Sequence, residues 1–282
     1  MSSETKDKME LRSSQDELNK EPDFPVNDLE ELREFVKTNP ELPKISDRRL
    51  IQFHFSCFYN VEDTKKCIRT YYDCFTKYSD FFADRSMSDP AIKIMRTLVA
   101  QYVSPIRTKD DSQIIVARLV NTDASNYTFD LALKYFIMAI EASIHLYGLA
   151  KHTEVVIDYK DITLRHFLKV KIGTIQKIVK VYEEALPIRA RAVHIVNVNY
   201  YISKMISIAK PFVSKELFEK VKFYTEDQLD DFRNQVPVEC LPTELGGDLG
   251  STASLSEKFE ASMSLVEPYF AEEEKLVAQA EH

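Results

Sequence analysis

The sequence has 282 residues, of which 44% are hydrophobic and 29% charged, with a formal net charge of −8. This composition is that of a globular protein with a substantial core, and the negative sum disfavours a general nucleic-acid binder, which needs a basic surface. There are only five glycines, where average usage would give about twenty. None of them fits a glycine-rich phosphate loop, so dinucleotide and P-loop folds are disfavoured.

The charges are unevenly distributed along the chain. Residues 189–222 contain seven Lys or Arg against two acidic residues, whereas residues 223–282 contain three against fourteen. A basic segment therefore borders an acidic C-terminal region.

The number of cysteines and the length of the apolar runs indicate the cellular compartment in which the protein works. Four cysteines in a chain of this length, with no leader-like apolar segment at its start, predict a reducing, cytoplasmic setting. No window approaches the roughly 18 uninterrupted apolar residues of a membrane span, so we expect only transient contact with membrane surfaces. His54, Cys57, Cys67 and Cys74 include no CxxC pair, and no metal site is predicted.

The N-terminal part reads as a charged tail followed by a small helical unit. Residues 1–24 lack apolar periodicity and are expected to be disordered or frayed. Helices are predicted from Asn27 or Asp28 to Asn39-Pro40, from the cap at Ser46-Asp47, and over 61–82, where apolar residues recur at helical spacing. These helices define a unit over 25–88.

Residues 89–251 have the pattern of an α/β domain. Asp89-Pro90 opens a helix predicted to continue through Ile94, Leu98 and Tyr102. Short apolar runs then alternate with longer helical segments, which indicates a mostly parallel sheet covered on both faces. The strands are predicted at 114–116, 155–157 and 192–198, with a further strand possible at 221–224, and the intervening helices at 128–148 and 164–186.

The rest of this domain ends in irregular chain. Residues 200–209 are strongly apolar, and a new helix starts after Pro211 and Ser214. The run PVECLPTELGGDLG closes the domain, and residues 252–282 are predicted to form an amphipathic helical extension.

This order of elements resembles the CRAL-TRIO family of lipid-exchange domains, nearest to its tocopherol- and retinaldehyde-binding branch. The resemblance covers about residues 46–250. It is most specific in a strand ending in Asn, an apolar helix, Lys-Pro-Phe, and a terminal Leu-Pro-x-Glu-x-Gly-Gly. It implies a sheet that floors a hydrophobic cavity, with residues 200–212 as a mobile lid. The chain departs from many relatives by Asp161 after the second strand and by the absence of tryptophan.

The resemblance also implies which residues line the cavity, although each could instead be ordinary core. These are Tyr135, Phe136, Ala139, Ile140, Ile157, Val181, Tyr182, Leu186, Ile188, Val193, Ile195, Ile202, Ile206 and Phe212. Polar groups that could select the ligand's head are Tyr135, Tyr182, Ser143 and His145. Ile188 stands where the phosphatidylinositol-transfer branch has a glutamate, which favours a small hydrophobic cargo over a phospholipid held by its headgroup.

Four basic residues are the predicted phosphoinositide contacts, by the same resemblance: Arg189, Arg191, Lys215 and Lys220. Arg189 and Arg191 lie two residues apart before a strand, so an extended backbone would send both side chains to one side. The competing interpretation is surface ion pairing, because Lys215 with Glu219 and Glu216 with Lys220 are i,i+4 pairs.

These observations predict a carrier that needs no cofactor and no catalytic group. Its partners would be a tocopherol-, retinoid- or carotenoid-like ligand and anionic membrane lipids that favour opening of the lid. An enzyme is disfavoured because the histidines accompany no nucleophile-elbow motif. A scaffold of the same fold, with its cavity filled by side chains, remains the alternative.

Overall fold

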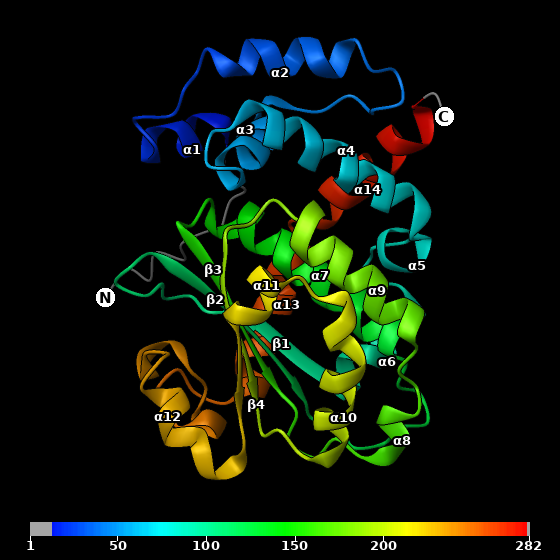
Figure 1. The fold of residues 1–282 in the computed structure, drawn as a ribbon, viewed down its shortest axis with the longest axis vertical. Helices are drawn as coiled ribbons and strands as arrows, with labels where there is room; N and C mark the ends of the chain where they lie inside the picture. Colours follow the sequence, from blue (N-terminus) through cyan, green and yellow to red (C-terminus); the bar gives the residue numbers. More distant parts are fainter. Residues whose placement is uncertain (1–12, 281–282) are drawn as a thin grey trace, which may run out of the picture.

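A computed structural model describes residues 13–280. Figure 1 shows a helical unit at one end of the molecule and a sheet covered by helices at the other. The helical unit contains α1 (Ser14–Lys20), α2 (Asp28–Lys37), α3 (Asp47–Ser56), α4 (Val61–Lys77) and α5 (Ser79–Phe82).

The starts of the predicted N-terminal helices are confirmed. The Ser46 side chain accepts from the Arg49 N–H at the start of α3, and the Asn60 side chain accepts from the Asp63 N–H at the start of α4. The predicted helix over 61–82 is interrupted at Tyr78, where the backbone leaves the helical region (φ −114°, ψ 61°) before the short helix α5 begins.

Part of the predicted tail is helical instead. Residues 1–12 lie outside the described residues, but Ser13 and Asp16 form a capping box that starts α1. The Glu17 side chain is buried and accepts from the Leu149 N–H at 2.9 Å. The helix is therefore held by a contact 132 residues away in sequence, which local composition does not reveal.

The second unit is built on a five-stranded sheet with strand order β1-β2-β3-β4-β5. The first pair is antiparallel and the other three pairs are parallel, so the predicted mostly parallel α/β fold is confirmed. The strands are β1 (Val99–Val103), β2 (Ser112–Leu119), β3 (His152–Asp158), β4 (Ala190–Val196) and β5 (Val221–Tyr224).

Strand β1 was predicted as helix, and that prediction is wrong. Helix α6 (Pro90–Leu98) begins at the predicted Asp89 cap but ends at Leu98, and Tyr102 pairs with Val116 of β2. The apolar spacing at Ile94, Leu98 and Tyr102 fits a helix, but pairing with β2 buries Tyr102 completely. Pairing with β2 therefore decides the secondary structure of this segment, against its local apolar periodicity.

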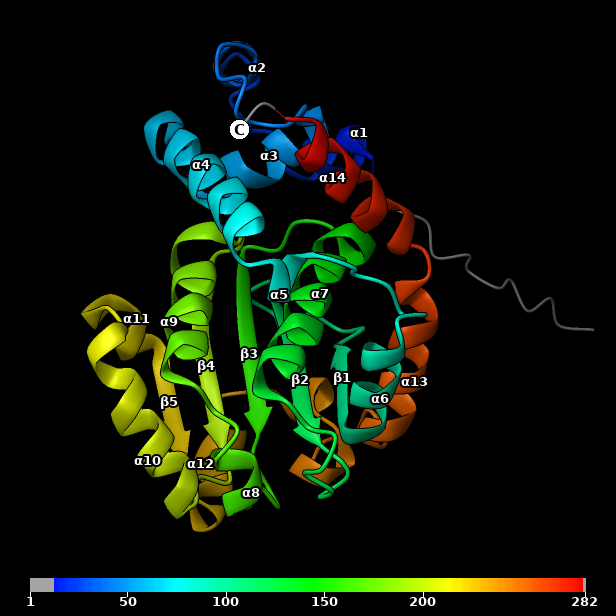
Figure 2. The same ribbon diagram turned by 90° about the vertical axis from the view of Figure 1, so that its right-hand side faces the viewer.

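Helices on one face of the sheet connect the parallel strands. Figure 2 shows α7, α9 and α10 on this face and α12 on the other. The predicted helix over 164–186 is divided into α8, α9 and a π-helical turn, η1. The elements are α7 (Phe129–Tyr147), α8 (Leu164–Phe167), α9 (Ile172–Lys180), η1 (Val181–Ala185), α10 (Tyr200–Ala209), η2 (Lys210–Phe212), α11 (Lys215–Lys220) and α12 (Leu229–Arg233).

The segment after α12 folds tightly because it contains two adjacent glycines. Gly246 has a φ of +82°, a backbone conformation that favours glycine. At Gly247 an added Cβ would lie 2.1 Å from the Leu241 carbonyl oxygen. The Gly-Gly pair is thus required by a turn and by a close backbone approach.

The predicted C-terminal extension forms α13 (Thr252–Met263) and α14 (Glu267–Gln279). Helix α13 covers the outer edge of β1, where the Ser256 hydroxyl accepts from the Gln101 N–H at 3.1 Å. This contact pairs an edge-strand donor that would otherwise be open.

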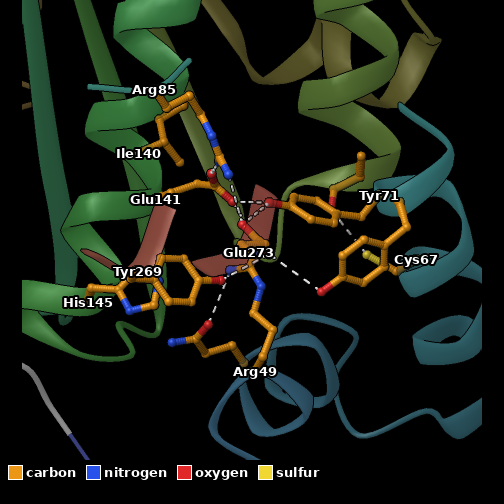
Figure 3. A network of polar contacts seen from close by, with 12 residues as sticks. Arg49, Cys67, Tyr71, Arg85, Ile140, Glu141, His145, Tyr269 and Glu273 are labelled. Atoms are coloured by element: carbon orange, nitrogen blue, oxygen red, sulfur yellow. Dashed lines mark hydrogen bonds and ion pairs between the residues drawn. The ribbon is translucent and has the colours of Figure 1, made fainter. Parts of the chain in front are cut away.

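Helix α14 returns to the N-terminal unit and joins it through a buried polar network (Figure 3). Glu141 of α7 accepts from Arg49 of α3 at 2.7 Å and from Arg85, after α5, at 2.6 Å. Glu273 of α14 accepts from Arg85 at 3.1 Å and from the Tyr71 hydroxyl of α4 at 3.1 Å. The network therefore connects the helical unit, α7 and the C-terminal helix.

Candidate functional site

The principal cavity lies between the sheet and helices α7, α9 and α10. Its volume is about 270 Å³, and its walls are almost entirely apolar. This is many times the roughly 10–15 Å³ that one water molecule needs on such a scale. The space is therefore large enough for a ligand with several apolar groups.

All five strands contribute to the floor. Residues two apart on a strand share a face, and this alternation gives every strand at least one such pair in the lining. The pairs are Val99 and Gln101, Ala117 and Leu119, Val155 and Ile157, Val193 and Ile195, and Val221 and Phe223.

Two helices present apolar stripes to the same space. In α7 the lining residues are Phe129, Ala132, Leu133 and Phe136, and in α10 they are Ile202, Met205, Ile206 and Ala209. Both sets have i, i+3, i+4, i+7 spacing, which places four side chains on one helical face. Helix α10 therefore forms one wall of the cavity with its apolar face, at the position predicted for the lid.

The predicted cavity residues divide into two equal groups. The structure places seven of them in the lining: Phe136, Ile157, Tyr182, Val193, Ile195, Ile202 and Ile206. It places the other seven outside the lining: Tyr135, Ala139, Ile140, Val181, Leu186, Ile188 and Phe212.

Three residues of α7 that were predicted to line the cavity lie outside it, because the cavity faces only the first half of that helix. Its stripe ends at Phe136, so Ala139 and Ile140 lie beyond the end of the cavity and are fully buried in core. Tyr135 lies off the stripe, and its hydroxyl donates to Glu260 of α13 at 2.8 Å.

The remaining positions lie beside the cavity. Val181 and Leu186 are buried core residues, and Phe212, at 37% exposed, lies on the outer surface. Ile188 lines a second pocket of about 20 Å³ near Phe55. Sequence reasoning missed the floor residues of β1, β2 and β5, although alternation within each strand is the signal that identifies them.

Of the four predicted head-selecting residues, only Tyr182 reaches the cavity. The Ser143 hydroxyl donates to the Ile140 carbonyl at 2.6 Å. His145 contacts Arg48 at 2.6 Å and packs on Tyr269 with ring centroids 3.8 Å apart. Burial, followed by the neighbouring Arg48 charge, lowers the pKa of His145 well below its usual value, so this histidine is neutral.

Two buried polar atoms of cavity residues have no hydrogen-bond partner in the described part of the chain. They are the Tyr182 hydroxyl and the Gln101 side-chain oxygen. Burial raises the pKa of Tyr182, so its hydroxyl keeps its proton and can donate. Leaving such atoms unpaired costs about 1–3 kcal/mol each.

The cavity's charged lining is neutralised internally. Arg118 pairs with the buried carboxylate of Asp158 at 2.7 Å, and Asn197 donates to the same carboxylate at 2.6 Å. Asn197 has a positive φ of 57°, and the chain turns there toward helix α10. The pair compensates the charges of Arg118 and Asp158, whereas Lys210, which is also in the lining, has no acidic partner among residues 13–280 and packs on the Phe218 ring.

Helix α10 is attached mainly by apolar packing. Asn199 caps it by accepting from the N–H groups of Tyr201 and Ile202, and donates to the Ile162 carbonyl at 3.2 Å. Within the described range, no side-chain hydrogen bond or ion pair joins residues 200–213 to another element apart from that cap. Only Ile202 of the helix is fully buried. Few polar contacts must break for it to move.

Each of the four predicted phosphoinositide contacts has a partner among the described residues. The Arg189 Nε donates to the Phe55 carbonyl at 2.8 Å, and its guanidinium stacks on Phe55 and Phe58 at 3.7 and 4.4 Å from the ring centroids. Arg191 pairs with Asp110 at 3.1 Å and lies 3.7 Å from Glu154.

The expectation that both arginines share one side fails because the register shifts between Thr153 and Glu154, opposite Ala190 and Ala192. This irregularity breaks the two-residue alternation between Arg189 and Arg191. Lys215 lies 4.0 Å from Glu219, and Lys220 pairs with Glu216 at 2.9 Å, as the ion-pair interpretation expected.

An apolar cavity floored by a mostly parallel sheet and walled by helices is the architecture of a lipid-binding domain. The CRAL/TRIO domain model matches residues 100–247, and the Pinta-like UBA domain model matches residues 21–92. The first match spans more than half of the chain, so the protein belongs to the CRAL/TRIO domain family. The resemblance inferred from the sequence is confirmed.

Curated relatives and a solved structure agree with this assignment. Human clavesin-2 is 26% identical over 254 residues, covering 88% of this chain and 75% of the relative. Clavesin-1 of Xenopus laevis is 23% identical over 238 residues, covering 83% and 71%. The crystal structure of Sfh5 matches with a TM-score of 0.53 at 12% identity, covering 88% of this chain and 97% of that one, and so shows the fold alone.

None of the helices within residues 13–280 combines the length and apolar character needed to cross a bilayer.

Proposed function

We propose that this protein is an intracellular carrier that binds one small hydrophobic ligand in its cavity and transfers it at membranes. The observation that carries the proposal is the apolar cavity of about 270 Å³ beneath helix α10. Burying roughly 400–500 Å² of ligand surface is worth on the order of 10 kcal/mol before the costs of association. Apolar burial alone is then sufficient for binding.

The polar atoms in the lining narrow the ligand's chemistry. The Tyr182 hydroxyl can donate to a ligand oxygen, and the Gln101 side-chain oxygen can accept from a ligand hydroxyl. Arg118 is paired with Asp158 and is not available to an ionic head, which leaves Lys210 as the cation of the described lining without an acidic partner. We infer an uncharged ligand with a hydroxyl or carbonyl on an apolar body, which includes tocopherol-, retinoid- and carotenoid-like molecules.

The membrane-facing surface is inferred from exposed apolar residues at the α8–α10 end. Helices α8 and α10 lie together at the end of the molecule opposite the N-terminal unit (Figures 1 and 2). Leu168 is 71% exposed, Tyr200 69% and Ile172 55%. An exposed apolar cluster beside the lid is suited to enter the interfacial layer of a bilayer when α10 opens.

The segments that carry this cluster, and α10 beside it, are rich in basic residues. Residues 160–171 and 200–213 together contain six Lys or Arg against one acidic residue, Asp161. Each basic group near an anionic surface contributes about 1 kcal/mol. We infer that anionic lipids, phosphoinositides among them, favour release by attracting this end of the molecule; the contribution of Arg189, Arg191, Lys215 and Lys220 stays a prediction.

Cavity filling tests the binding step. Ala132→Phe inserts a ring into the cavity from α7, and Ala271→Phe makes the same change on exposed chain in α14. A fluorescent hydrophobic alcohol should bind the unmodified protein and Ala271→Phe equally, and Ala132→Phe at least about tenfold more weakly. Equal affinity for all three proteins would contradict binding in this cavity.

Transfer between vesicles tests the membrane step. Leu168→Glu should slow delivery of a bound hydrophobe to vesicles containing phosphatidylinositol phosphates, whereas Leu265→Glu, at a less exposed surface site between α13 and α14, should not. The double variant Arg189→Ala with Arg191→Ala tests whether the membrane contact lies at these arginines or at the α8–α10 end. If only that pair slows transfer, the membrane contact lies there and not at the α8–α10 end.

The scaffold alternative predicts a cavity filled by the protein's own side chains. The seventeen Phe and fourteen Tyr of the chain do not fill it, since Phe129, Phe136 and Tyr182 form its walls and leave the space between them. This supports a carrier over a scaffold.

A further inference from the structure

The lid, residues 200–212, carries two lysines that lie over aromatic rings. Lys204 is in α10 and Lys210 is in η2, and both side chains are exposed. The Lys204 ammonium lies 5.4 Å from the centre of the Tyr200 ring, and the Lys210 ammonium lies 5.1 Å from that of the Phe218 ring. Neither lysine has a carboxylate within ion-pair distance among residues 13–280, so both charges are open to an external anion.

The two ring contacts differ in what they join. Tyr200 and Lys204 are four residues apart on α10, so this contact moves with the helix. The contact between Lys210 and Phe218 instead joins the end of the lid to α11. Within the described part of the chain, no other contact between a cation and a ring joins the lid to another element.

Helix α11 is attached to the sheet and not to the lid. The Phe218 ring packs on Phe223 of β5, with centroids 6.0 Å apart, and the Ser214 side chain starts α11 separately by accepting from the Leu217 N–H. Lys210, Phe218 and Phe223 all line the cavity. Movement of α10 away from the cavity therefore separates Lys210 from the Phe218 ring.

The acidic residues of α11 do not compensate Lys210. Glu216 pairs with Lys220 at 2.9 Å, and Glu219 lies 4.0 Å from Lys215. An external anion can therefore approach Lys210 without displacing an ion pair.

We propose that Lys210 couples contact with an anionic lipid phosphate to opening of the lid, an inference that rests on the proposed carrier function. A ligand shifts an equilibrium between two states only if it binds one of them better. In the closed lid the Lys210 ammonium faces the Phe218 ring, whereas in the open lid it is free to contact a phosphate, which therefore favours opening. Lys204 keeps its ring in both states, so it attracts the protein to the surface without favouring either state.

The neighbours of Lys210 favour a phosphate at a bilayer over one in solution. Phe212, two residues further on, is 37% exposed, and Tyr200 at the other end of α10 is 69% exposed. Exposed rings beside an ammonium suit the interfacial layer, where the rings enter the acyl boundary and the ammonium meets the headgroups. A soluble phosphate offers no apolar layer to these rings.

The test measures release of a bound fluorescent hydrophobic alcohol at vesicle concentrations that bind all of the protein. Phosphatidylcholine vesicles give the neutral rate, and vesicles with added phosphatidylinositol 4-phosphate give the anionic rate. Lys210→Met should raise the neutral rate about two- to fivefold, because the ring contact is lost. It should also lower the ratio of anionic to neutral rate at least about threefold, because the phosphate contact is lost.

Two further variants separate coupling from attraction and from simple loss of packing. Lys210→Arg keeps the charge and the ring contact, and should behave as the unmodified protein. Lys204→Met removes the other charge of the lid; it should need more vesicles to reach saturation but keep the ratio of anionic to neutral rate.

The inference is overturned if Lys204→Met and Lys210→Met lower this ratio equally, or if Lys210→Met leaves it unchanged. Either result leaves the carrier function standing, because that function is judged on the unmodified protein. An unmodified protein that binds the alcohol but releases it equally to both kinds of vesicle contradicts the membrane step and this inference together. Glycerophosphoinositol 4-phosphate, the headgroup without acyl chains, should not raise the neutral rate; a rate equal to the anionic one would overturn the assignment to a bilayer.

Discussion

Replacing Glu273 with alanine removes a carboxylate shared by two buried guanidinium groups. Glu273 is 5% exposed, lies 3.1 Å from Arg85 and 3.7 Å from Arg49, and accepts from the Tyr71 hydroxyl. Burial alone would raise the pKa of Glu273, but the charges of Arg49 and Arg85 outweigh it and lower this pKa. The carboxylate is therefore ionised in the folded protein.

The loss of stability in Glu273→Ala depends on which carboxylates still compensate Arg49 and Arg85. Without Glu273, Arg49 keeps Glu141 as its partner, and Arg85 keeps Glu141 and the more exposed Glu274. Removing one partner from a buried ion pair costs about 3–5 kcal/mol, because a charge is left uncompensated away from water. Against a total of about 5–15 kcal/mol, this is a large fraction of the free energy of unfolding.

Urea unfolding followed by far-ultraviolet circular dichroism measures this loss; tryptophan emission cannot report it, because the chain has no tryptophan. Glu272→Ala is the matched control, since Glu272 lies 3.8 Å from Lys275, with both side chains exposed, and should cost less than about 1 kcal/mol. The reasoning is refuted if Glu273→Ala and Glu272→Ala unfold within 1 kcal/mol of each other, a margin of about the typical surface effect. The pair Arg85→Met with Glu273→Leu removes one charge of each sign, and should cost less than the sum of its single changes.

Three further predictions concern single positions. Tyr182→Phe should weaken binding of a hydrophobic alcohol about five- to tenfold and leave binding of a pure hydrocarbon unchanged, and equal effects on both would exclude a hydrogen bond to the ligand. Gly247→Ala should lower the free energy of unfolding by about 1–3 kcal/mol; Gly173→Ala, where nothing lies within 4 Å of the new Cβ, should not lower it. The lowered pKa of His145 means that the unfolded chain gains a proton below about pH 6.5 and the folded one does not, so stability should fall on acidification by up to about 1.4 kcal/mol per pH unit. His145→Asn should reduce that slope, and an unchanged slope would contradict a neutral buried His145.

Local signals were sufficient for most of the architecture. Caps such as Ser46 and the Asp89-Pro90 pair act within one helical turn, so the sequence identifies them directly. The apolar runs of β3 and β4 are long enough to indicate buried parallel strands. Strand β1 was missed because the choice between helix and strand at Val99–Val103 depends on pairing with β2.

The sequence predicted that an apolar cavity lies on the sheet, but only half of the residues predicted to line it do so. Its location along α7 depends on where the sheet and α10 meet that helix, which periodicity alone does not specify. The aromatic stacking of Arg189 on Phe55 joins residues 134 apart, and the irregularity that separates it from Arg191 lies in the pairing with β3. Both are tertiary features with no local signature.

Cavity occupancy is the most direct measure of carrier function. The protein should be purified from cells that naturally express it, extracted with organic solvent, and analysed by mass spectrometry beside an identically prepared Ala132→Phe protein. The unmodified protein is predicted to yield close to one uncharged hydrophobic molecule per chain, and Ala132→Phe much less. Equal and trace amounts from both would contradict a lipid-carrying interior.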